Sequence, residues 1–375
     1  MDLQKRTWAE ISLGAIRHNY EAIRRTLPSG TRFLGVVKAD AYGHGALAVS
    51  RLLAELGAEY LAVSCLDEAM ELRSGGIGLP ILILGHTPPT YVPLLIEQNL
   101  TQTVTCEAKA EEFSAVAAAV GGRLKVHIAL DTGMGRLGFL CAGRHFEAGV
   151  KNVIAAVSSP HLIPEGVFTH LARSDEPGQE ARDFTLGQIG LFNDVLTEVS
   201  KISGFKFPLR HCASSGGVLN YIPEAAMDMV RPGLLLYGYG DEGRLGLRPA
   251  MSLMTTVSTI KHYDAGTPIS YGGTFVTERR TRMGVLPIGY ADGLLRCLSG
   301  RFSFWTAGGQ APQRGRICMD MCMADLTGLD KVNLDSRVEV FGQHNSLDEL
   351  ARTAGTIPYE LLCSVSKRVP RVYVD

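Results

Sequence analysis

The sequence predicts an α/β fold in two parts: a (β/α)8 barrel of the TIM type at residues 11–240 and a mainly-β domain at residues 241–375. The chain has 375 residues, 46% of them hydrophobic, which is enough for two domains with separate cores. Short apolar runs alternate with helix-length segments up to Gly240, whereas closely spaced strands predominate after it. We also expect residues 1–10 to pack with the β domain.

The first part begins with a helix, because Ile16, Tyr20, Ile23 and Leu27 recur every three or four residues before a Pro-Ser-Gly stop. The apolar runs that follow are continuous, which is typical of parallel strands covered on both faces. They lie at residues 33–37, 60–64, 80–84, 101–105, 123–130, 165–169, 207–211 and 227–231, with helix-length segments such as 45–57, 107–120 and 180–202 between them. Eight β/α units in about 230 residues match a TIM-type barrel. An open, doubly wound sheet would give the same pattern.

The second part starts after a polar segment, Asp-Glu-Gly-Arg, at residues 241–244. Glycine and proline then recur roughly every 8 to 15 residues, which is typical of short strands joined by turns. The expected strands are 252–260, 268–272, 282–288, 302–306, 314–325 and 337–341, and only residues 346–354 are expected to be helical.

Composition excludes several classes of protein. Lys and Arg number 37 against 38 Asp and Glu, and the net charge of −1 argues against nucleic acid or an anionic membrane as a partner. The N-terminus lacks a secretory signal, and no stretch approaches the roughly 18 apolar residues of a membrane span. The eight cysteines show no C-x-x-C spacing, which disfavours a disulfide scaffold or a zinc site. We therefore expect a cytoplasmic protein without a bound metal.

Lys38 is the first candidate for chemistry. Reactive side chains of a barrel gather at the C-terminal ends of its strands, and the first apolar run leads directly into Lys38. A lysine at such a position can lose its proton more easily and form a Schiff base. Taken alone, Lys38 also fits a surface lysine that extends its ammonium to solvent.

The later strand ends add groups that bind anions. The fifth leads into a Gly-rich loop that presents Arg136, which suits a small carboxylate, and the sixth ends at His170. The seventh ends in serines and glycines at 211–217, and the eighth in Arg231 and Gly233, where barrels commonly bind phosphate. A lysine, a phosphate cradle and a carboxylate-sized arginine together indicate pyridoxal phosphate and an amino acid.

The segment Val-Lys-Ala-Asp-Ala-Tyr-Gly-His-Gly at 37–45 resembles the pyridoxal-phosphate attachment signature of alanine racemases. The resemblance runs from Trp8 to the last residues. The other matching segments are 131–136, 169–170, 231–233, 237–238, 288–293, 315–320 and 368–371. It implies a barrel with a C-terminal β domain that takes in the first residues, and a head-to-tail homodimer with two shared active sites.

The resemblance also implies residue roles. Lys38 would hold pyridoxal 5'-phosphate and act as one base, and Tyr271 would reach in from the partner subunit as the second, since racemisation needs a base on each face. A tyrosine with a pKa of about 10 needs neighbouring cations or hydrogen bonds to serve near neutral pH. By itself, Tyr271 in a Gly-rich turn fits a structural cap.

Further family positions fall on residues of this chain. Arg231 would face the pyridine nitrogen and keep it neutral, which favours proton exchange over side reactions such as transamination. The positions implied to hold the cofactor are Tyr42, His170, Ser215, Arg231, Gly233, Tyr237 and Tyr359. The positions implied to bind the substrate are Arg136, Tyr290, Met319 and Asp320.

Three positions depart from the family pattern. Ala129 stands where many members carry a lysine that can be carbamylated and hold the substrate-binding arginine, so Arg136 must be placed by another group or a bound anion. Gly273 stands where the family often has an arginine, and Ser214 replaces a frequent asparagine. These departures concern the tuning of the site and its substrate range.

The reaction implied is the interconversion of L- and D-alanine for peptidoglycan synthesis in a bacterium. One alternative is a racemase for serine or a broader set of amino acids on the same scaffold. Another is a non-catalytic pyridoxal-phosphate-binding protein, which the whole β domain and Tyr271 disfavour. Amino-acid decarboxylases share the barrel and cofactor, but the motifs here follow the racemase pattern.

Overall fold

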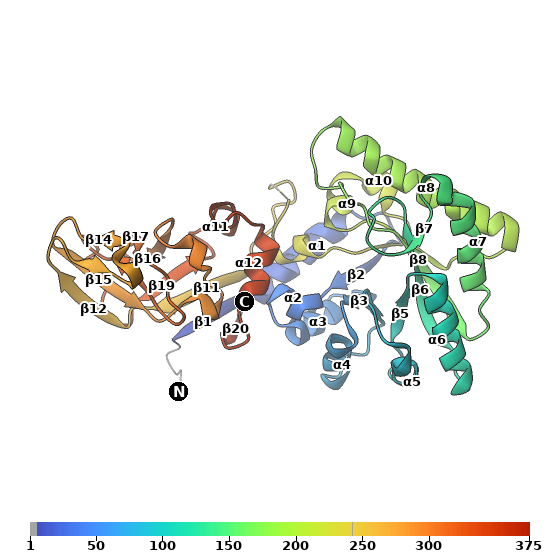
Figure 1. Ribbon diagram of the computed structural model, residues 1–375, viewed down its shortest axis with the longest axis horizontal. Coiled ribbons are helices and arrows are strands. Elements are labelled where there is room, and N and C mark those ends of the chain that lie inside the picture. Colours follow the sequence, from blue (N-terminus) through green and yellow to red (C-terminus); the bar gives the residue numbers. More distant parts are fainter. Residues whose placement is uncertain (1–5, 242) are drawn as a thin grey trace. The chain divides into compact units, whose positions relative to one another are not determined.

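The computed structural model describes residues 6–241 and 243–375, and these form two compact units (Figure 1). One unit comprises Arg17–Ala41 and Ala46–Leu247 and contains the parallel sheet. The other comprises the described residues up to Ile16, the short segment Tyr42–Gly45, and Arg248–Asp375. The chain thus enters the β-rich unit three times.

The parallel sheet has eight main strands, and it closes almost completely into a barrel. Its strands are β2 (Arg32–Val36), β3 (Tyr60–Val63), β4 (Ile81–Ile83), β5 (Thr101–Val104), β6 (Leu124–Asp131), β8 (Leu162–Phe168), β9 (Leu209–His211) and β10 (Met229–Val230). They follow the order β10-β2-β3-β4-β5-β6-β8-β9. Between the two ends, Asp228 N donates to Arg210 O (3.1 Å) and Arg231 N donates to Ala213 O (2.8 Å). The predicted barrel with its eight strands is therefore confirmed, and the open sheet is excluded.

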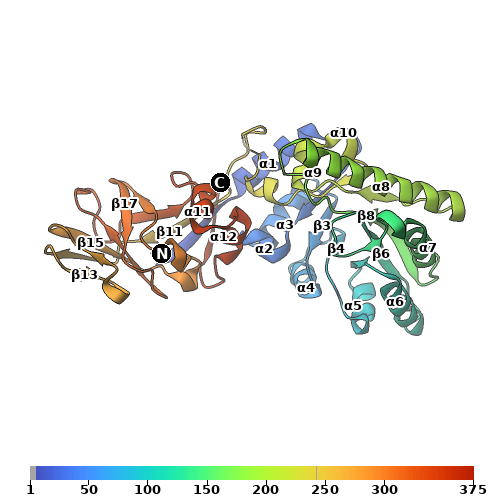
Figure 2. The same ribbon diagram turned by 45° about the horizontal axis from the view of Figure 1, so that its top comes forward.

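Helices cover the outside of this barrel (Figure 2). They are α1 (Leu13–Thr26), which begins in the β-rich unit, α3 (Ala46–Glu55), α4 (Leu66–Ser74), α5 (Val92–Glu97), α6 (Glu107–Ala119), α7 (Phe146–Val157) and α8 (Gln179–Ser203), with α9 (Ser215–Asn220) and α10 (Ile222–Ala225) before the last strand. Strand residues such as Leu61, Ile83 and Val126 are fully buried, as expected for parallel strands with both faces covered. A short β7 (Phe139–Leu140) pairs with the end of β6 and was not predicted.

The β-rich unit has one nine-stranded sheet. Its strands are β1 (Thr7–Ser12), β11 (Met251–Thr256), β12 (Thr259–Tyr263), β15 (Thr281–Leu286), β16 (Ser303–Thr306), β17 (Gly309–Arg314), β18 (Cys322–Asp325), β19 (Arg337–Phe341) and β20 (Arg371–Val374), and β13 (Pro268–Ile269) pairs with β14 (Phe275–Val276) apart from it. The N-terminal β1 lies antiparallel to β11 and parallel to β20. The sheet thus joins both ends of the chain.

Three predicted elements of the β-rich unit are wrong. Residues 314–325 form no single strand, because β17 ends at Arg314 and a turn closed by Cys318 N to Met321 O (3.0 Å) precedes β18. Residues 252–260 divide between β11 and β12, and the strand at 268–272 stops at Ile269. In the turn, buried Ile317 alternates with exposed Met319 and Met321, which imitates a strand with one buried face.

The expectation of a single helix in this half is also wrong. Besides α11 (Leu347–Ala354), the chain forms α12 (Pro358–Ser364), which begins with a proline, a residue suited to the first helical turn. It spans only seven residues, too few to show a clear helical period. Among the described residues, no helix is both long and apolar enough to cross a membrane.

Candidate active site

Lys38 follows β2 at the C-terminal end of the barrel, where the chain makes an unusual turn. Residues Ala39, Asp40, Ala41 and Tyr42 all have left-handed backbone angles, with φ values of 52°, 54°, 54° and 53°. A left-handed conformation costs an L-residue about 1–2 kcal/mol, so the turn needs support from its surroundings. Ala39 N donates to Glu68 Oε1 (2.6 Å), and Ala46 N donates to Asp40 Oδ1 (2.7 Å). Strain of this kind tends to collect at functional sites.

Three cations at this end of the barrel lie near enough to His170 to affect its charge, and Arg231 Nη2 is 3.4 Å from His170 Nδ1. Burial lowers the pKa of His170 to about 3, and the charges of Arg231, Arg136 and Lys38 add to this effect. His170 is therefore neutral at physiological pH, while the groups around it are positive. The structure thus brings together four predicted site residues, from the ends of four strands, in a region suited to an anionic ligand.

Arg231 is the most buried of these cations, with 4% of its surface exposed, and burial lowers its pKa to about 10. Its Nη1 donates to His211 Nδ1 (2.8 Å), and its Nη2 donates to Thr169 O (2.9 Å). The guanidinium also lies 5.2 Å from the centre of the Phe168 ring. None of these contacts uses Nε–H, so the plane of the group is held while this N–H can still donate to a ligand.

Ser215 and Gly233 lie next to each other on the loops after β9 and β10. The Ser215 hydroxyl accepts hydrogen bonds from Gly233 N (3.1 Å) and Leu235 N (3.4 Å). Ser215 begins α9, and the N–H groups of a first helical turn have no partner within their helix. A Cβ on Gly216 would lie 2.6 Å from Ser174 Oγ, so only glycine fits there. The two loops together form a group of donors suited to phosphate.

Three tyrosines predicted at the cofactor have different surroundings. Tyr237 is fully buried, and its hydroxyl donates to Val36 O (2.9 Å), near the end of the strand that precedes Lys38. Tyr42 and Tyr359 both belong to the β-rich unit, and their ring centres are 5.8 Å apart. Burial raises the pKa of Tyr42, and the neighbouring Tyr359 contributes to the rise, so its hydroxyl keeps its proton.

The Arg136 loop is held through Asp131, whose Oδ1 accepts from Gly133 N (3.0 Å) and Gly135 N (3.1 Å). Arg136 itself is exposed and forms no hydrogen bond or ion pair within residues 6–241 and 243–375. Ala129 is buried in β6 and has only a methyl group to offer. The loop thus presents a guanidinium whose donors are available to a carboxylate.

Adjacent loops of the β-rich unit carry the other predicted residues. Ser270 Oγ donates to Arg316 O (2.8 Å), and Tyr290 N donates to Cys318 O (3.0 Å). These bonds tie the segments that hold Tyr271, Tyr290, Met319 and Asp320. Tyr271 is 70% exposed, Met319 53% and Tyr290 43%. Large apolar and aromatic side chains exposed on neighbouring loops are typical of an interaction surface.

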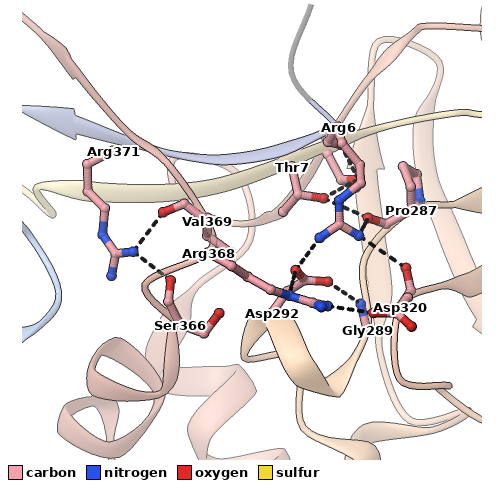
Figure 3. Close-up of polar contacts among 11 residues, drawn as sticks. Arg6, Thr7, Pro287, Gly289, Asp292, Asp320, Ser366, Arg368, Val369 and Arg371 are labelled. Carbon is pink, nitrogen blue, oxygen red and sulfur yellow. Dashed lines mark hydrogen bonds and ion pairs between the residues drawn. The ribbon is translucent and has the colours of Figure 1, made fainter.

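Asp292, in the same loop as Tyr290, is completely buried. Figure 3 shows its polar partners. Asp292 Oδ1 pairs with Arg6 and with Arg368 Nε (2.8 Å), while its Oδ2 accepts from Gly289 N (2.9 Å). Arg368 Nη2 also donates to Asp320 Oδ1 (2.9 Å). Two arginines and two aspartates thus join both ends of the chain to the loops of Tyr290 and Met319. We call this group the Asp292 cluster.

Sequence reasoning assigned no role to Asp292, Arg6 or Arg368. Asp292 and Arg368 both lie in segments that carry the family resemblance, Ile-Gly-Tyr-Ala-Asp-Gly and Arg-Val-Pro-Arg. An acidic residue inside an otherwise apolar and Gly-containing segment was the available signal. Its partners Arg6 and Arg368, 286 and 76 residues away, could not be identified from the sequence.

Comparisons with known proteins agree with this arrangement. The family models for the N-terminal and C-terminal domains of alanine racemase match residues 11–241 and 250–373. An alanine racemase of Desulfovibrio desulfuricans is 41% identical over 377 residues, covering 98% of this chain and 98% of its own.

Solved structures are similar over the same length. An alanine racemase of Clostridium difficile 630 matches 100% of this chain and 97% of its own, with a TM-score of 0.92 and 35% identity. An alanine racemase of Bacillus anthracis with bound L-Ala-P matches 100% of this chain and 96% of its own, with a TM-score of 0.91 and 33% identity. The two family models together match almost the whole chain, and the related sequences and structures match it over the same length. This protein therefore belongs to the alanine racemase family of amino-acid isomerases.

Proposed function

We propose that this protein interconverts L- and D-alanine with pyridoxal 5'-phosphate held at Lys38. The observation that carries the proposal is the convergence of Lys38, Arg136 and Arg231 around the neutral His170 at the strand ends. One amine and two guanidinium groups suit a cofactor with a carbonyl carbon and a phosphate, together with a substrate that carries a carboxylate. When bound, pyridoxal phosphate withdraws electrons from the amino acid's Cα and makes its proton exchangeable.

The donors present fit this cofactor. Lys38 supplies the amine that binds the cofactor's carbonyl carbon, and Ser215 with the N–H groups of the first turn of α9 supplies donors for the phosphate. The Nε–H of Arg231 can donate to the pyridine nitrogen, because the recorded contacts of this side chain use Nη1 and Nη2. An arginine keeps its proton, so the ring nitrogen stays neutral. His170 would lie beside the ring as a neutral group.

The two proton-transfer groups come from different copies of the chain in this proposal. Lys38 Nζ exchanges the proton on one face of Cα, and the hydroxyl oxygen of the partner subunit's Tyr271 exchanges it on the other. The exposure of Tyr271, Tyr290 and Met319 in a single chain supports a second copy that covers these loops. A homodimer with two shared sites follows from this scheme.

Arg136 binds the substrate carboxylate in this scheme, and the backbone around Met319 helps to orient it. Tyr290 narrows the entrance, and the Asp320 carboxylate, which pairs with Arg368, supports the Met319 turn. Tyr42, Gly233 and Tyr359 stand at the family positions that the resemblance implies for the phosphate. Tyr237 supports the end of β2 through Val36 and so acts on the cofactor through Lys38.

A racemase for serine or for a wider set of amino acids is the second candidate. It is favoured by Ala129, because this position offers only a methyl group and no described residue holds Arg136 through a hydrogen bond or ion pair. The L-Ala-P bound by the Bacillus anthracis relative favours alanine. The supply of D-alanine to peptidoglycan and a cytoplasmic location stay predictions.

A chiral assay of the purified protein with L-alanine, D-alanine, L-serine and L-arginine tests the proposal. We expect turnover of alanine in both directions and much slower turnover of serine and arginine. The matched control, Lys38→Ala, should abolish turnover and the visible absorbance of the bound cofactor together. Equal rates for serine would establish the broader racemase, and no turnover of any amino acid would contradict both candidates.

A further inference from the structure

A chain of three side chains crosses the barrel interior behind the proposed cofactor site. Arg231 Nη1 lies 2.8 Å from His211 Nδ1, and His211 Nε2 lies 2.8 Å from His127 Nδ1. Both histidines are completely buried, one on β9 and the other on β6. Neither of them has a role in the proposed reaction.

The direction of the hydrogen bonds in this chain follows from the chemistry of arginine. A guanidinium only donates, so His211 Nδ1 must be the unprotonated, accepting nitrogen. A neutral His211 then carries its proton on Nε2 and donates to His127 Nδ1. His127 in turn must carry its proton on Nε2. Every bond points away from the arginine.

Burial and the neighbouring charge keep both histidines neutral. Burial lowers the pKa of His127 to about 3, and the charge of Arg231 adds to this effect. Burial likewise lowers the pKa of His211 well below its ordinary value, with contributions from Arg231 and then His127. A protonated His211 could not accept from Arg231, so the chain requires the neutral forms.

The barrel is built around the His127 ring. A Cβ on Gly166 of β8 would lie 2.6 Å from His127 Cε1, so a side chain there would displace the imidazole. The His211 ring stacks on Phe168 at 5.1 Å, and Arg231 lies over the same phenyl ring. The far nitrogen, His127 Nε2, has no hydrogen-bond partner among residues 6–241 and 243–375. Packing therefore holds the His127 ring, whose Nε2 forms no hydrogen bond with a described residue.

We propose that His127 is a positioning residue, which fixes the proton of His211 on Nε2 and thereby holds the Arg231 guanidinium toward the pyridine nitrogen. The effect on the cofactor rests on the proposed function, whereas the tautomers of the two histidines do not depend on it. Without an acceptor at His127 Nδ1, His211 is free to take the other tautomer, with the proton on Nδ1. It then presents a donor to a donor, and Arg231 loses the Nη1 bond that fixes its plane together with the bond from Nη2 to Thr169 O.

The tautomers can be measured directly in the holoenzyme. The protein has 10 histidines, which can be labelled with ¹⁵N, and the signals of the buried pair are assigned by their loss in His127→Asn and His211→Asn. We expect both to be neutral and protonated on Nε2 throughout the range of about pH 5 to 8 in which ordinary histidines titrate. An Nδ1-protonated form of either residue, or titration of either in this range, would overturn the proposal. This outcome is independent of racemase activity.

Three variants then test the effect on Arg231. In His127→Asn the amide oxygen can replace Nδ1 as the acceptor, whereas His127→Leu removes it at similar volume. Val126→Ala, next to it on β6, is a control for damage to the barrel core. We expect His127→Leu to shift the visible absorption of the bound cofactor and to lower kcat about tenfold, the usual scale for losing a partner that orients a catalytic group, with KM little changed.

His127→Asn should restore both readouts, and Val126→Ala should lower the melting temperature without moving the absorption. If all three variants alter the absorption equally, or if His127→Leu leaves it unchanged, His127 has only a packing role. A protein that shows the expected tautomers and absorption shift but racemises no amino acid would contradict the proposed function and leave this inference standing.

Discussion

At the scale of single residues, the Asp292 carboxylate stands apart because it is fully buried and meets two arginines. Its Oδ1 pairs with Arg6 and Arg368, and its Oδ2 accepts from Gly289 N. A charge removed from water is tolerated only when it is paired and hydrogen-bonded, and all of these conditions are met here. The Asp292 cluster therefore holds the loops of Tyr290 and Met319 as one piece.

Asp292→Asn should destabilise the β-rich unit. The amide keeps the size of the carboxylate but removes the charge to which both arginines donate. The arginines themselves are 43% and 41% exposed and stay solvated, so the expected cost is that of losing hydrogen bonds to a charged group, about 1.5–3 kcal/mol. Chemical denaturation measures the loss. Asp228→Asn is the matched control, because it breaks the half-exposed pair of Asp228 with Arg210 and should cost only about 1 kcal/mol or less. Equal losses in the two variants would contradict the special role of Asp292.

Individual site residues differ in how well the sequence predicted them. Lys38, Arg136, His170 and Arg231 stand at the ends of apolar runs, where the barrel pattern alone draws attention to polar side chains. His127 lies inside an apolar run, where a histidine is more often a core residue, and no pattern paired it with His211. That pair depends on the order of strands in the sheet, which places β6 and β9 on either side of β8.

At the scale of the elements, the left-handed turn Ala39–Tyr42 is one of the features that the sequence did not predict. None of its four residues is a glycine, although glycine is the residue that adopts such angles without strain. The turn is closed by Ala41 N to Val37 O (2.9 Å) and supported by Glu68. Tertiary contacts here outweigh the local preference of the residues.

The exposed Ala39 permits a test of this strain. Ala39→Gly removes the penalty of the left-handed conformation, about 1 kcal/mol, and loses a similar amount through greater freedom of the unfolded chain. We expect unchanged or slightly raised stability in thermal unfolding. The control Ala54→Gly, on the exposed side of the right-handed α3, should lower stability by about 0.5–1 kcal/mol. An equal loss in both variants would show that the turn is not strained.

At the scale of the whole molecule, the chain divides its proposed machinery between two units. The cations lie at the end of the barrel, while Tyr271, Tyr290, Met319 and Asp320 lie on loops of the β-rich unit. Large exposed side chains on those loops are costly in water and are expected to be covered. A homodimer that exchanges these loops would complete each site with residues of both copies.

Hybrid dimers test this sharing. Lys38→Ala and Tyr271→Phe are each expected to be inactive as homodimers, whereas a heterodimer of the two contains one site with both native residues. Co-expression with two different affinity tags should therefore yield heterodimers with about half of the native activity, since one of two equivalent sites is intact. A Lys38→Ala chain paired with the Lys38→Ala/Tyr271→Phe double variant is the control, because neither site is intact. Heterodimers as inactive as this control would contradict shared sites.

The sequence by itself determined the two-part organisation, the eight strands and the cationic residues at their ends. These are encoded locally, because a continuous apolar run followed by a polar residue has the same meaning wherever the rest of the chain lies. Only the tertiary structure decided that the sheet closes, that Asp292 joins Arg6 to Arg368, and that the His127 and His211 rings meet inside the barrel. Each of these depends on contacts between residues far apart in the chain, which periodicity cannot reveal.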